Sequence, residues 1–218
     1  MNIKNNLGHS ADISLTAELS IPINGNNIID FKKLARLYKD ELLDNVLPFW
    51  LEHSQDNEYG GYFTCLDRDG RVFDTDKFIW LQGREVWMFS MLYNKVEKRQ
   101  EWLDCAILGG EFLKKYGHNG NYNWYFSLDR SGRPLVEPYN IFSYTFATMA
   151  FGQLSLATGS QEYADIAKKT FDIILSKVDN PKGKWNKLHP GTRNLKNFAL
   201  PMILCNLCLL YTSDAADE

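Results

Sequence analysis

The sequence predicts a mainly α-helical fold in which helix pairs follow one another as an α/α toroid. Apolar residues recur at three- and four-residue steps over several long segments, which is the mark of amphipathic helices. Hairpin signals separate these helices, and the second hairpin follows the first after 62 positions. A unit of one hairpin and two helices buries its apolar face only against its neighbours, so about three such units are expected in this chain.

Composition narrows the class of protein further. The chain has 218 residues, of which 44% are hydrophobic and 14% aromatic, enough for a sizeable buried core. The net charge is only -3, and the Lys and Arg residues form no basic cluster. Neither nucleic acid nor a membrane surface is therefore expected as a partner. No apolar run approaches the ~18 residues of a membrane span, and the N-terminus lacks a signal-peptide pattern.

Four cysteines occur, at positions 65, 105, 205 and 208. Cys205 and Cys208 have the spacing of redox or metal-binding pairs, but they lie within an apolar helical run, and no second pair with zinc-site spacing exists. We therefore expect core cysteines and no metal site. Reduced thiols without a signal peptide predict a cytoplasmic protein.

The N-terminal part combines a loose extension with a long helix. Residues 1–27 show no sustained period and are predicted to be a flexible extension. A helix is expected from Asp30, whose side chain can cap it, to about His53, with a kink or break at Pro48. A turn-rich loop then leads to the first hairpin, whose turn is Asp67-Arg68-Asp69-Gly70.

The repeat body is predicted to cover residues 28–211. After the first hairpin, its expected elements are helices at 77–98 and 100–116, a second hairpin at 125–133, and helices at 139–158 and 160–178. A third round is expected to start at Gly183, with its helix beginning near Asn194 or Leu195. Residues 212–218 form a polar tail, which is either a natural acidic terminus or the point where the chain is cut short or wrongly continued; the second interpretation is favoured.

One stretch of the 77–98 helix carries a candidate site. Trp80, Arg84 and Trp87 stand at i, i+4 and i+7, so they share one helix face. An unpaired guanidinium on a core-facing stripe would cost several kcal/mol, because it cannot lose its proton. The spacing is thus consistent with a polar cavity lined with aromatic rings. The alternative is that the tryptophans pack while Arg84 reaches water or pairs with a carboxylate.

Several separated segments resemble the N-acylglucosamine 2-epimerases, also known as renin-binding proteins. These segments are FWLEHSQD (49–56), GGYFTCL (60–66), WLQGREVWM (80–88), GGEFL (109–113), IFSYTFATMA (141–150) and ALPMIL (199–204). They occur in the family's order and span residues 30 to 210. The resemblance implies an (α/α)6 barrel, of which this chain would be the N-terminal half. A ring of six units of this repeat length would need roughly 370 residues.

The resemblance also implies a reaction and residue roles. The family interconverts N-acetylglucosamine and N-acetylmannosamine by deprotonation and reprotonation at carbon 2, and Arg84 matches the arginine that stabilises the negative charge of the enediolate. Trp80, Trp87 and Tyr144 are candidates for lining the substrate cavity, although packing is favoured for Trp87. Asn197 lies near a position where some relatives have an active-site histidine. An amino-sugar substrate, a homodimer, no required cofactor and ATP as an allosteric activator are implied.

The histidines depart from the family pattern. The family transfers protons with two histidines from the second half of the barrel, and none of His9, His53, His118 and His189 matches them. The chain as given is therefore expected to be an inactive fragment of the epimerase. The alternatives are a cellobiose 2-epimerase or aldose-ketose isomerase of the same fold, a non-catalytic module that binds a sugar or nucleotide, and an interaction protein.

Overall fold

A computed structural model describes residues 20–23, 26–138, 141–179, 189 and 198–212. The chain divides into two compact units, Met1–Trp50 and Leu51–Glu218. Among the helices described, none combines the length and apolar character needed to cross a membrane.

The first unit contains a hairpin and a helix. Strands β1 (Ser20–Ile23) and β2 (Asn26–Ile29) pair antiparallel, whereas the sequence predicted a loose extension over residues 1–27; residues 1–19 lie outside the described part. Helix α2 (Phe31–Glu41) has Asp30 as its N-cap, as predicted. The Asp30 carboxylate accepts hydrogen bonds from the backbone N–H groups of Lys32 and Lys33 at 3.0 and 3.1 Å, so it caps the first turn.

The disturbance predicted at Pro48 takes the form of a π-helical turn. Helix α2 continues into η1 (Leu42–Val46) and then α3 (Leu47–His53), which ends at the predicted residue. Within η1, Leu47 N–H donates to the carbonyl of Leu42, five residues back. Proline has no N–H group to donate to the carbonyl four residues earlier. The helical hydrogen-bond pattern therefore shifts by one residue just before Pro48, and the helix continues past it.

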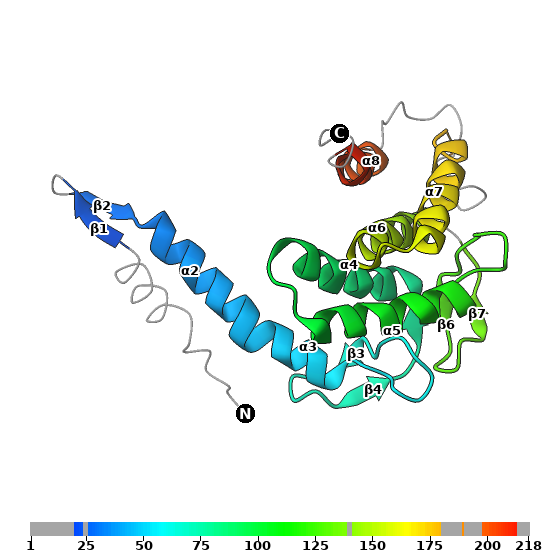
Figure 1. Cartoon of the computed structure of the whole chain (residues 1–218), viewed down its shortest axis with the longest axis horizontal. Helices are drawn as coiled ribbons and strands as arrows, with labels where there is room; N and C mark the ends of the chain where they lie inside the picture. The colour runs from blue at the N-terminus through cyan, green and yellow to red at the C-terminus, as the bar shows by residue number, and fades with distance from the viewer. Residues whose placement is uncertain (1–19, 24–25, 139–140, 180–188, 190–197, 213–218) are drawn as a thin grey trace. The chain divides into compact units, whose positions relative to one another are not determined.

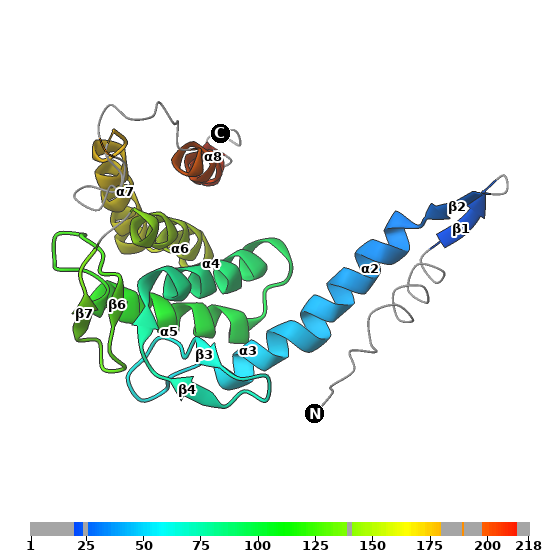
Figure 2. The same cartoon turned by 180° about the vertical axis from the view of Figure 1, so that it is seen from behind.

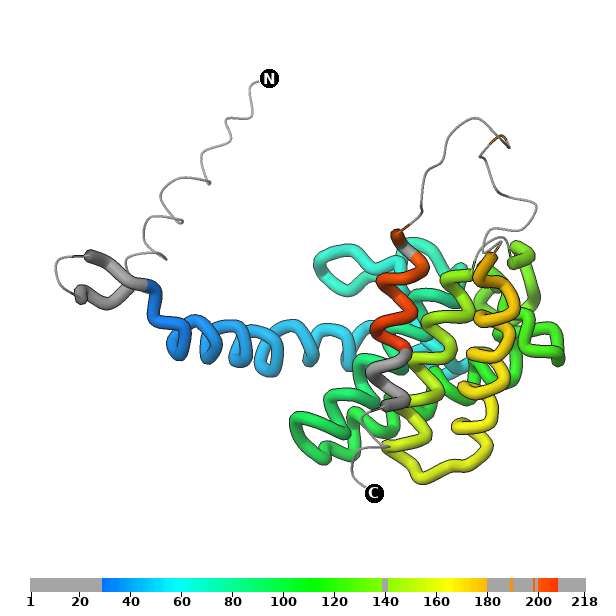
Figure 3. The backbone as a smooth tube through the Cα atoms, turned by 90° about the horizontal axis from the view of Figure 1, so that it is seen from above, coloured from blue at the N-terminus to red at the C-terminus, as the bar shows by residue number. Residues whose placement is uncertain are grey.

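The second unit is built from helices that alternate between two layers. Helix α4 packs against α5 and α6, and α6 packs in turn against α7 and α8 (Figure 1). The same succession is seen from behind in Figure 2 and from above in Figure 3, where α8 runs beside α6. Helices α4, α6 and α8 therefore succeed one another in one layer, with α5 and α7 behind them. Their bounds are α4 Ile79–Lys95, α5 Gln100–Tyr116, α6 Phe142–Thr158, α7 Gln161–Ser176 and α8 Ala199–Thr212.

Short strands join the helices at one end. Strand β3 (Cys65–Leu66) pairs with β4 (Val72–Asp74) in the first predicted hairpin. In the second, β6 (Ser127–Leu128) pairs with β7 (Pro134–Val136) and also with β5 (Lys77–Phe78), the strand that leads into α4. The two hairpins were predicted; the pairing of β5 with β6, which ties one repeat to the next, was not.

The two hairpin turns confirm the internal repeat in atomic detail. In the first, the Asp67 carboxylate accepts from the backbone N–H of Arg71 at 2.8 Å and from its Nε at 2.9 Å. In the second, Asp129 accepts from the backbone N–H and Nε of Arg133 at 2.9 and 2.6 Å. Residues 62 positions apart thus make the same bonds.

The turn glycines repeat as well. Gly70 and Gly132 have φ values of +82° and +94°, which other residues rarely adopt. A Cβ atom on Gly70 would lie 2.4 Å from the His53 ring, and one on Gly132 would lie 2.5 Å from the Tyr116 ring. His53 and Tyr116 therefore hold equivalent places, each ending a helix and packing on the following turn.

The prediction of core cysteines, made for Cys205 and Cys208, is wrong for Cys205, and the side chain of Cys208 lies outside the described part of the chain. Cys105 is buried and Cys65 half-buried, but Cys205 is exposed; all three are free thiols. The buried residues of α8 are Leu200, Ile203 and Leu207, which lie three or four positions apart and mark the inner face. Cys205 lies on the opposite face.

The third round is described only from its helix onward. The predicted start at Gly183 and the helix starts near Asn194 and Leu195 lie outside the described residues, and α8 is assigned from Ala199. It reaches Thr212, and residues 213–218 of the predicted tail also lie outside that part of the chain.

Candidate functional site

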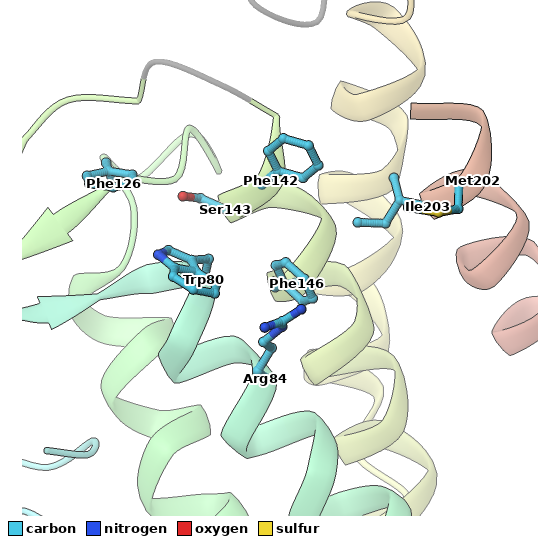
Figure 4. A pocket seen from close by; sticks show the side chains of 8 residues that line it. All are labelled: Trp80, Arg84, Phe126, Phe142, Ser143, Phe146, Met202 and Ile203. Carbon is cyan, nitrogen blue, oxygen red and sulfur yellow. The ribbon is translucent and has the colours of Figure 1, made fainter. Parts of the chain in front are cut away.

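A cavity of about 440 Å³ opens where α4, α6 and α8 meet. This volume lies within the range of small-molecule sites. Its lining residues, drawn in Figure 4, are Trp80, Arg84, Phe126, Phe142, Ser143, Phe146, Met202 and Ile203.

Arg84 brings the positive charge to this cavity. Its guanidinium carbon lies 4.5 Å from the centre of the Phe146 ring and 5.2 Å from that of the Trp80 ring. The negative faces of such rings attract a cation. Within the part of the chain that the structure describes, no carboxylate forms an ion pair with Arg84. Arg84 is exposed, so its guanidinium reaches water beside these two rings, as the alternative interpretation of the spacing allowed, and its N–H groups stay available to a ligand.

Gln82 fixes α4 to the loop before the first hairpin. Its side-chain oxygen accepts from the backbone N–H of Tyr62, and its side-chain nitrogen donates to the Tyr62 carbonyl, both at 2.8 Å. A Cβ atom on Gly61 would come within 2.7 Å of the Gln82 oxygen, so this contact needs the glycine. The residue two positions before Arg84 thereby sets the position of the helix that carries it.

Gly83 allows α4 and α6 to approach closely. A Cβ atom there would lie 2.9 Å from the carbonyl carbon and oxygen of Phe146, far inside van der Waals contact. The missing side chain is what brings the backbone at Phe146 up to α4, and with it the ring that contacts Arg84.

Glu85 points away from the cavity lining into the core. It is 7% exposed, and the Ser54 hydroxyl donates a hydrogen bond to its carboxyl group. Burial raises the pKa of Glu85 to about 8, although the bond from Ser54 acts in the opposite direction. The carboxyl group is therefore mostly protonated at neutral pH.

A buried ionic cluster anchors the start of α4. The Lys77 ammonium donates to Asp56 Oδ2 and to the Arg130 carbonyl, both at 2.9 Å, and to the Gly60 carbonyl. Arg130 Nε and Nη2 donate to the two oxygens of Asp56 at 2.9 and 3.0 Å. Burial opposes ionisation of Asp56, but the bonds from Arg130 and Lys77 outweigh it and lower its pKa to about 2.

This cluster holds two parts of the cavity together. Lys77 stands two residues before α4, and Ile79 N–H, at the start of the helix, donates to the Phe126 carbonyl at 3.0 Å. Phe126 lines the cavity with Trp80 and Arg84. This cluster was not predicted, because Asp56 and Arg130 lie in turn-rich segments and Lys77 was expected at the start of a helix, where solvated charges are the rule.

Comparison with known proteins identifies the family. The family model described as N-acylglucosamine 2-epimerase (GlcNAc 2-epimerase) matches residues 61–216. The chain belongs to the N-acylglucosamine 2-epimerase family. It is 43% identical to the N-acylglucosamine 2-epimerase of Bos taurus over 184 residues, which cover 81% of this chain and 44% of that protein. For the Homo sapiens protein the identity is 42% over 170 residues, or 76% and 40% of the two chains. The chain thus spans less than half the length of these relatives.

Solved structures confirm the α/α toroid as the fold class. The cellobiose 2-epimerase of Bacillus thermoamylovorans matches with a TM-score of 0.62 and 28% identity, covering 66% of this chain and 37% of that one. A D-mannose isomerase matches with a TM-score of 0.65 over 80% of this chain and 45% of that one. At 18% identity, the second match speaks for the fold alone.

Among the described site residues that were predicted, Trp80 and Arg84 line the cavity, whereas Trp87 and Tyr144 are not among its lining residues. Trp87 is half-buried on α4, and its buried Nε1 has no hydrogen-bond partner among the described residues. Tyr144 is 2% exposed; its hydroxyl donates to Asn123 Oδ1 at 3.2 Å and accepts from Lys177 Nζ at 2.8 Å. Asn197 lies outside the described residues.

The described histidines all lie away from the cavity lining. His53 packs on the first hairpin turn, and His189 is exposed. The His118 ring contacts the rings of Tyr122 and Trp124, with centroids 4.8 and 4.9 Å apart. Over the residues that the structure covers, no group of three or more His, Cys, Asp or Glu is placed to hold a metal ion.

Proposed function

We propose that this chain forms one wall of the sugar site of an N-acylglucosamine 2-epimerase, which interconverts N-acetylglucosamine and N-acetylmannosamine. The observation that carries the proposal is the Arg84 guanidinium, held 4.5 Å from the Phe146 ring in the cavity, with no carboxylate of the described residues to neutralise it. Identities of 42–44% to mammalian N-acylglucosamine 2-epimerases, against 28–30% to cellobiose 2-epimerases, favour an amino sugar over cellobiose.

The proposed chemistry assigns Arg84 an electrostatic role. Removing the proton from carbon 2 of the opened sugar places negative charge on the oxygen of carbon 1, and a fixed cation lowers the energy of that state. The rings of Trp80 and Phe126 offer flat apolar surfaces to the C–H faces of a sugar. Deprotonation and reprotonation leave the oxidation state of the sugar unchanged, so no redox cofactor is needed. ATP as an activator and a homodimer remain predictions from the family.

The proton carriers are proposed to come from outside the cavity lining described here. Neither a histidine nor a carboxylate is among the lining residues that the structure describes. We therefore expect the 218-residue chain to bind N-acetylmannosamine without exchanging its carbon-2 proton.

Saturation-transfer NMR with N-acetylmannosamine in deuterated water tests both expectations, that the sugar binds and that its carbon-2 proton does not exchange. The wild-type chain should saturate the ligand's protons, and Arg84→Met should weaken binding at least tenfold, the loss typical of a charged hydrogen bond. The matched control is Arg68→Met, which removes an exposed arginine of the first hairpin turn.

Equal binding by the Arg84→Met and Arg68→Met variants, or no binding by the wild-type chain, would contradict the proposed site. Deuterium appearing at carbon 2 would show that the chain does carry a proton-transferring group.

A further inference from the structure

The cavity has a polar side and an apolar side. In Figure 4, Trp80 and Arg84 project from α4, Met202 and Ile203 come from α8, and the rings of Phe142 and Phe146 lie between them. Apart from Arg84, the side-chain polar groups of the lining are the Ser143 hydroxyl and the Trp80 indole nitrogen. The α8 end of the cavity is therefore bounded by side chains that offer neither hydrogen-bond donors nor strong acceptors.

The chemistry of the proposed substrate fixes where its acyl group can lie. The acyl nitrogen is bonded to carbon 2, and carbon 2 is bonded to carbon 1, whose oxygen Arg84 would hold. The acyl group must therefore occupy the part of the cavity next to the guanidinium. The nearest ring to that guanidinium is Phe146, and beyond it lie the α8 side chains.

Such a surface distinguishes an acyl group from a hydroxyl group. A methyl group that leaves water for an apolar wall gains about 0.8 kcal/mol per carbon. A 2-hydroxyl group, like the amide N–H that replaces it in an N-acyl sugar, would give up bonds to water there at a cost of about 1–3 kcal/mol, but an aldose has no acyl methyl group whose burial offsets that loss.

We propose that Ile203 and Met202, together with Phe146, form an acyl subsite that selects N-acyl sugars over aldoses with a free 2-hydroxyl group, such as mannose. This inference rests on the proposed function. Ile203 is 8% exposed and gives the subsite a fixed floor. Met202 is 56% exposed, and its flexible thioether can adapt to acyl groups of different length.

Competition between sugars of different acyl length tests the subsite. Ile203→Ala removes the floor, so the affinity of N-butanoylmannosamine relative to N-acetylmannosamine should rise about tenfold over wild type, the effect of burying two methylene groups. Met202→Ala should raise the same ratio a few-fold, and because this side chain is mostly exposed, its removal should leave folding intact. Cys205→Ala, on the exposed face of α8, is the matched control.

In saturation-transfer spectra of the wild-type chain, the acyl methyl signal should also be stronger than the signals of the ring protons. If amino sugars bind but neither variant changes the acyl preference, or mannose binds as tightly as N-acetylmannosamine, the subsite is refuted while the proposed function stands. If no amino sugar binds, both fail.

Discussion

Replacing Glu85 by glutamine is expected to stabilise the chain, by an amount that grows between pH 4.5 and 8. Burial raises the pKa of this carboxyl group from an ordinary 4.5 to about 8. Above pH 4.5 the unfolded chain loses the proton while the folded chain keeps it, so the unfolded state gains stability. The contribution of the Glu85 carboxyl group to the stability of the wild-type chain is thus fully present below pH 4.5 and is lost progressively as the pH rises towards 8.

The size of the effect follows from the two pKa values. Each pH unit in this window changes the free energy of unfolding by about 1.4 kcal/mol, which amounts to roughly 3 kcal/mol at pH 7. Glutamine at this position stays neutral at every pH, and its carbonyl oxygen can still accept the Ser54 hydroxyl. Substitution of Glu85 should therefore remove the pH-dependent loss and keep the hydrogen bond.

Urea unfolding of the two chains at pH 5, 6, 7 and 8, followed by tryptophan fluorescence, measures this difference. Glu85→Gln should differ from wild type by under about 1 kcal/mol at pH 5 and by roughly 3 kcal/mol at pH 7. Glu101→Gln, which changes an exposed glutamate, should shift the free energy little at any of these pH values. A Glu85→Gln difference that is the same at pH 5 and pH 8 would refute the reasoning, because the carboxyl group would then be ionised in the folded chain.

Three further substitutions test how the site is held. Lys77→Met should lower the free energy of unfolding by about 3–5 kcal/mol in urea titrations, because it leaves Asp56 buried with one cation fewer; a loss below 1 kcal/mol would contradict the cluster. In wild type, the free energy of unfolding should fall as the pH drops from 3.8 through about 2, because Asp56 becomes protonated, and Asp56→Asn should remove this part of the pH dependence. The same pH dependence in both chains below pH 4 would argue against a low pKa of Asp56. Gly83→Ala should cost about 1–3 kcal/mol and weaken N-acetylmannosamine binding, because its Cβ pushes Phe146 away. Gly152→Ala, on α6, is the control. A Cβ atom there meets nothing within 4 Å, so the stability should stay the same or rise slightly. Equal effects of the two substitutions would count against the close contact between Gly83 and Phe146.

Local features of the fold were predictable because short-range rules decide them. Asp30 caps its helix through its own side chain, and the turn glycines, each three residues after the aspartate that opens the turn, adopt the positive φ that these turns require. The second hairpin could be found because Asp129 and Arg133 repeat the spacing of the first turn.

The apolar wall of the cavity was not predictable in the same way. Helix α6 packs against α4, α5, α7 and α8, so buried residues lie around its whole circumference and no single stripe marks the face that meets α4. Phe142 and Phe146 were therefore indistinguishable from ordinary core residues. Tyr144, on the same helix, was predicted from the family resemblance to line the substrate cavity, and this stays a prediction: it is not among the lining residues of the described cavity, and its hydroxyl contacts Asn123 and Lys177.

The Asp56 cluster escaped prediction for a different reason. Its members stand 21 and 74 positions apart, and only the packing of one hairpin loop on the next brings them together. Each residue taken singly has the sequence context of a surface charge. Long-range pairing of this kind leaves no periodic signal in a single sequence.

The NMR signal of the Arg84 Nε–H group offers the most direct measurement of whether this guanidinium receives the sugar. Its resonance, assigned by its absence in Arg84→Met, should shift saturably as N-acetylmannosamine is added, with the same Kd as the ligand's acyl methyl signal. If the Arg84 resonance stays unchanged while the sugar binds, the sugar lies elsewhere and Arg84 does not hold it.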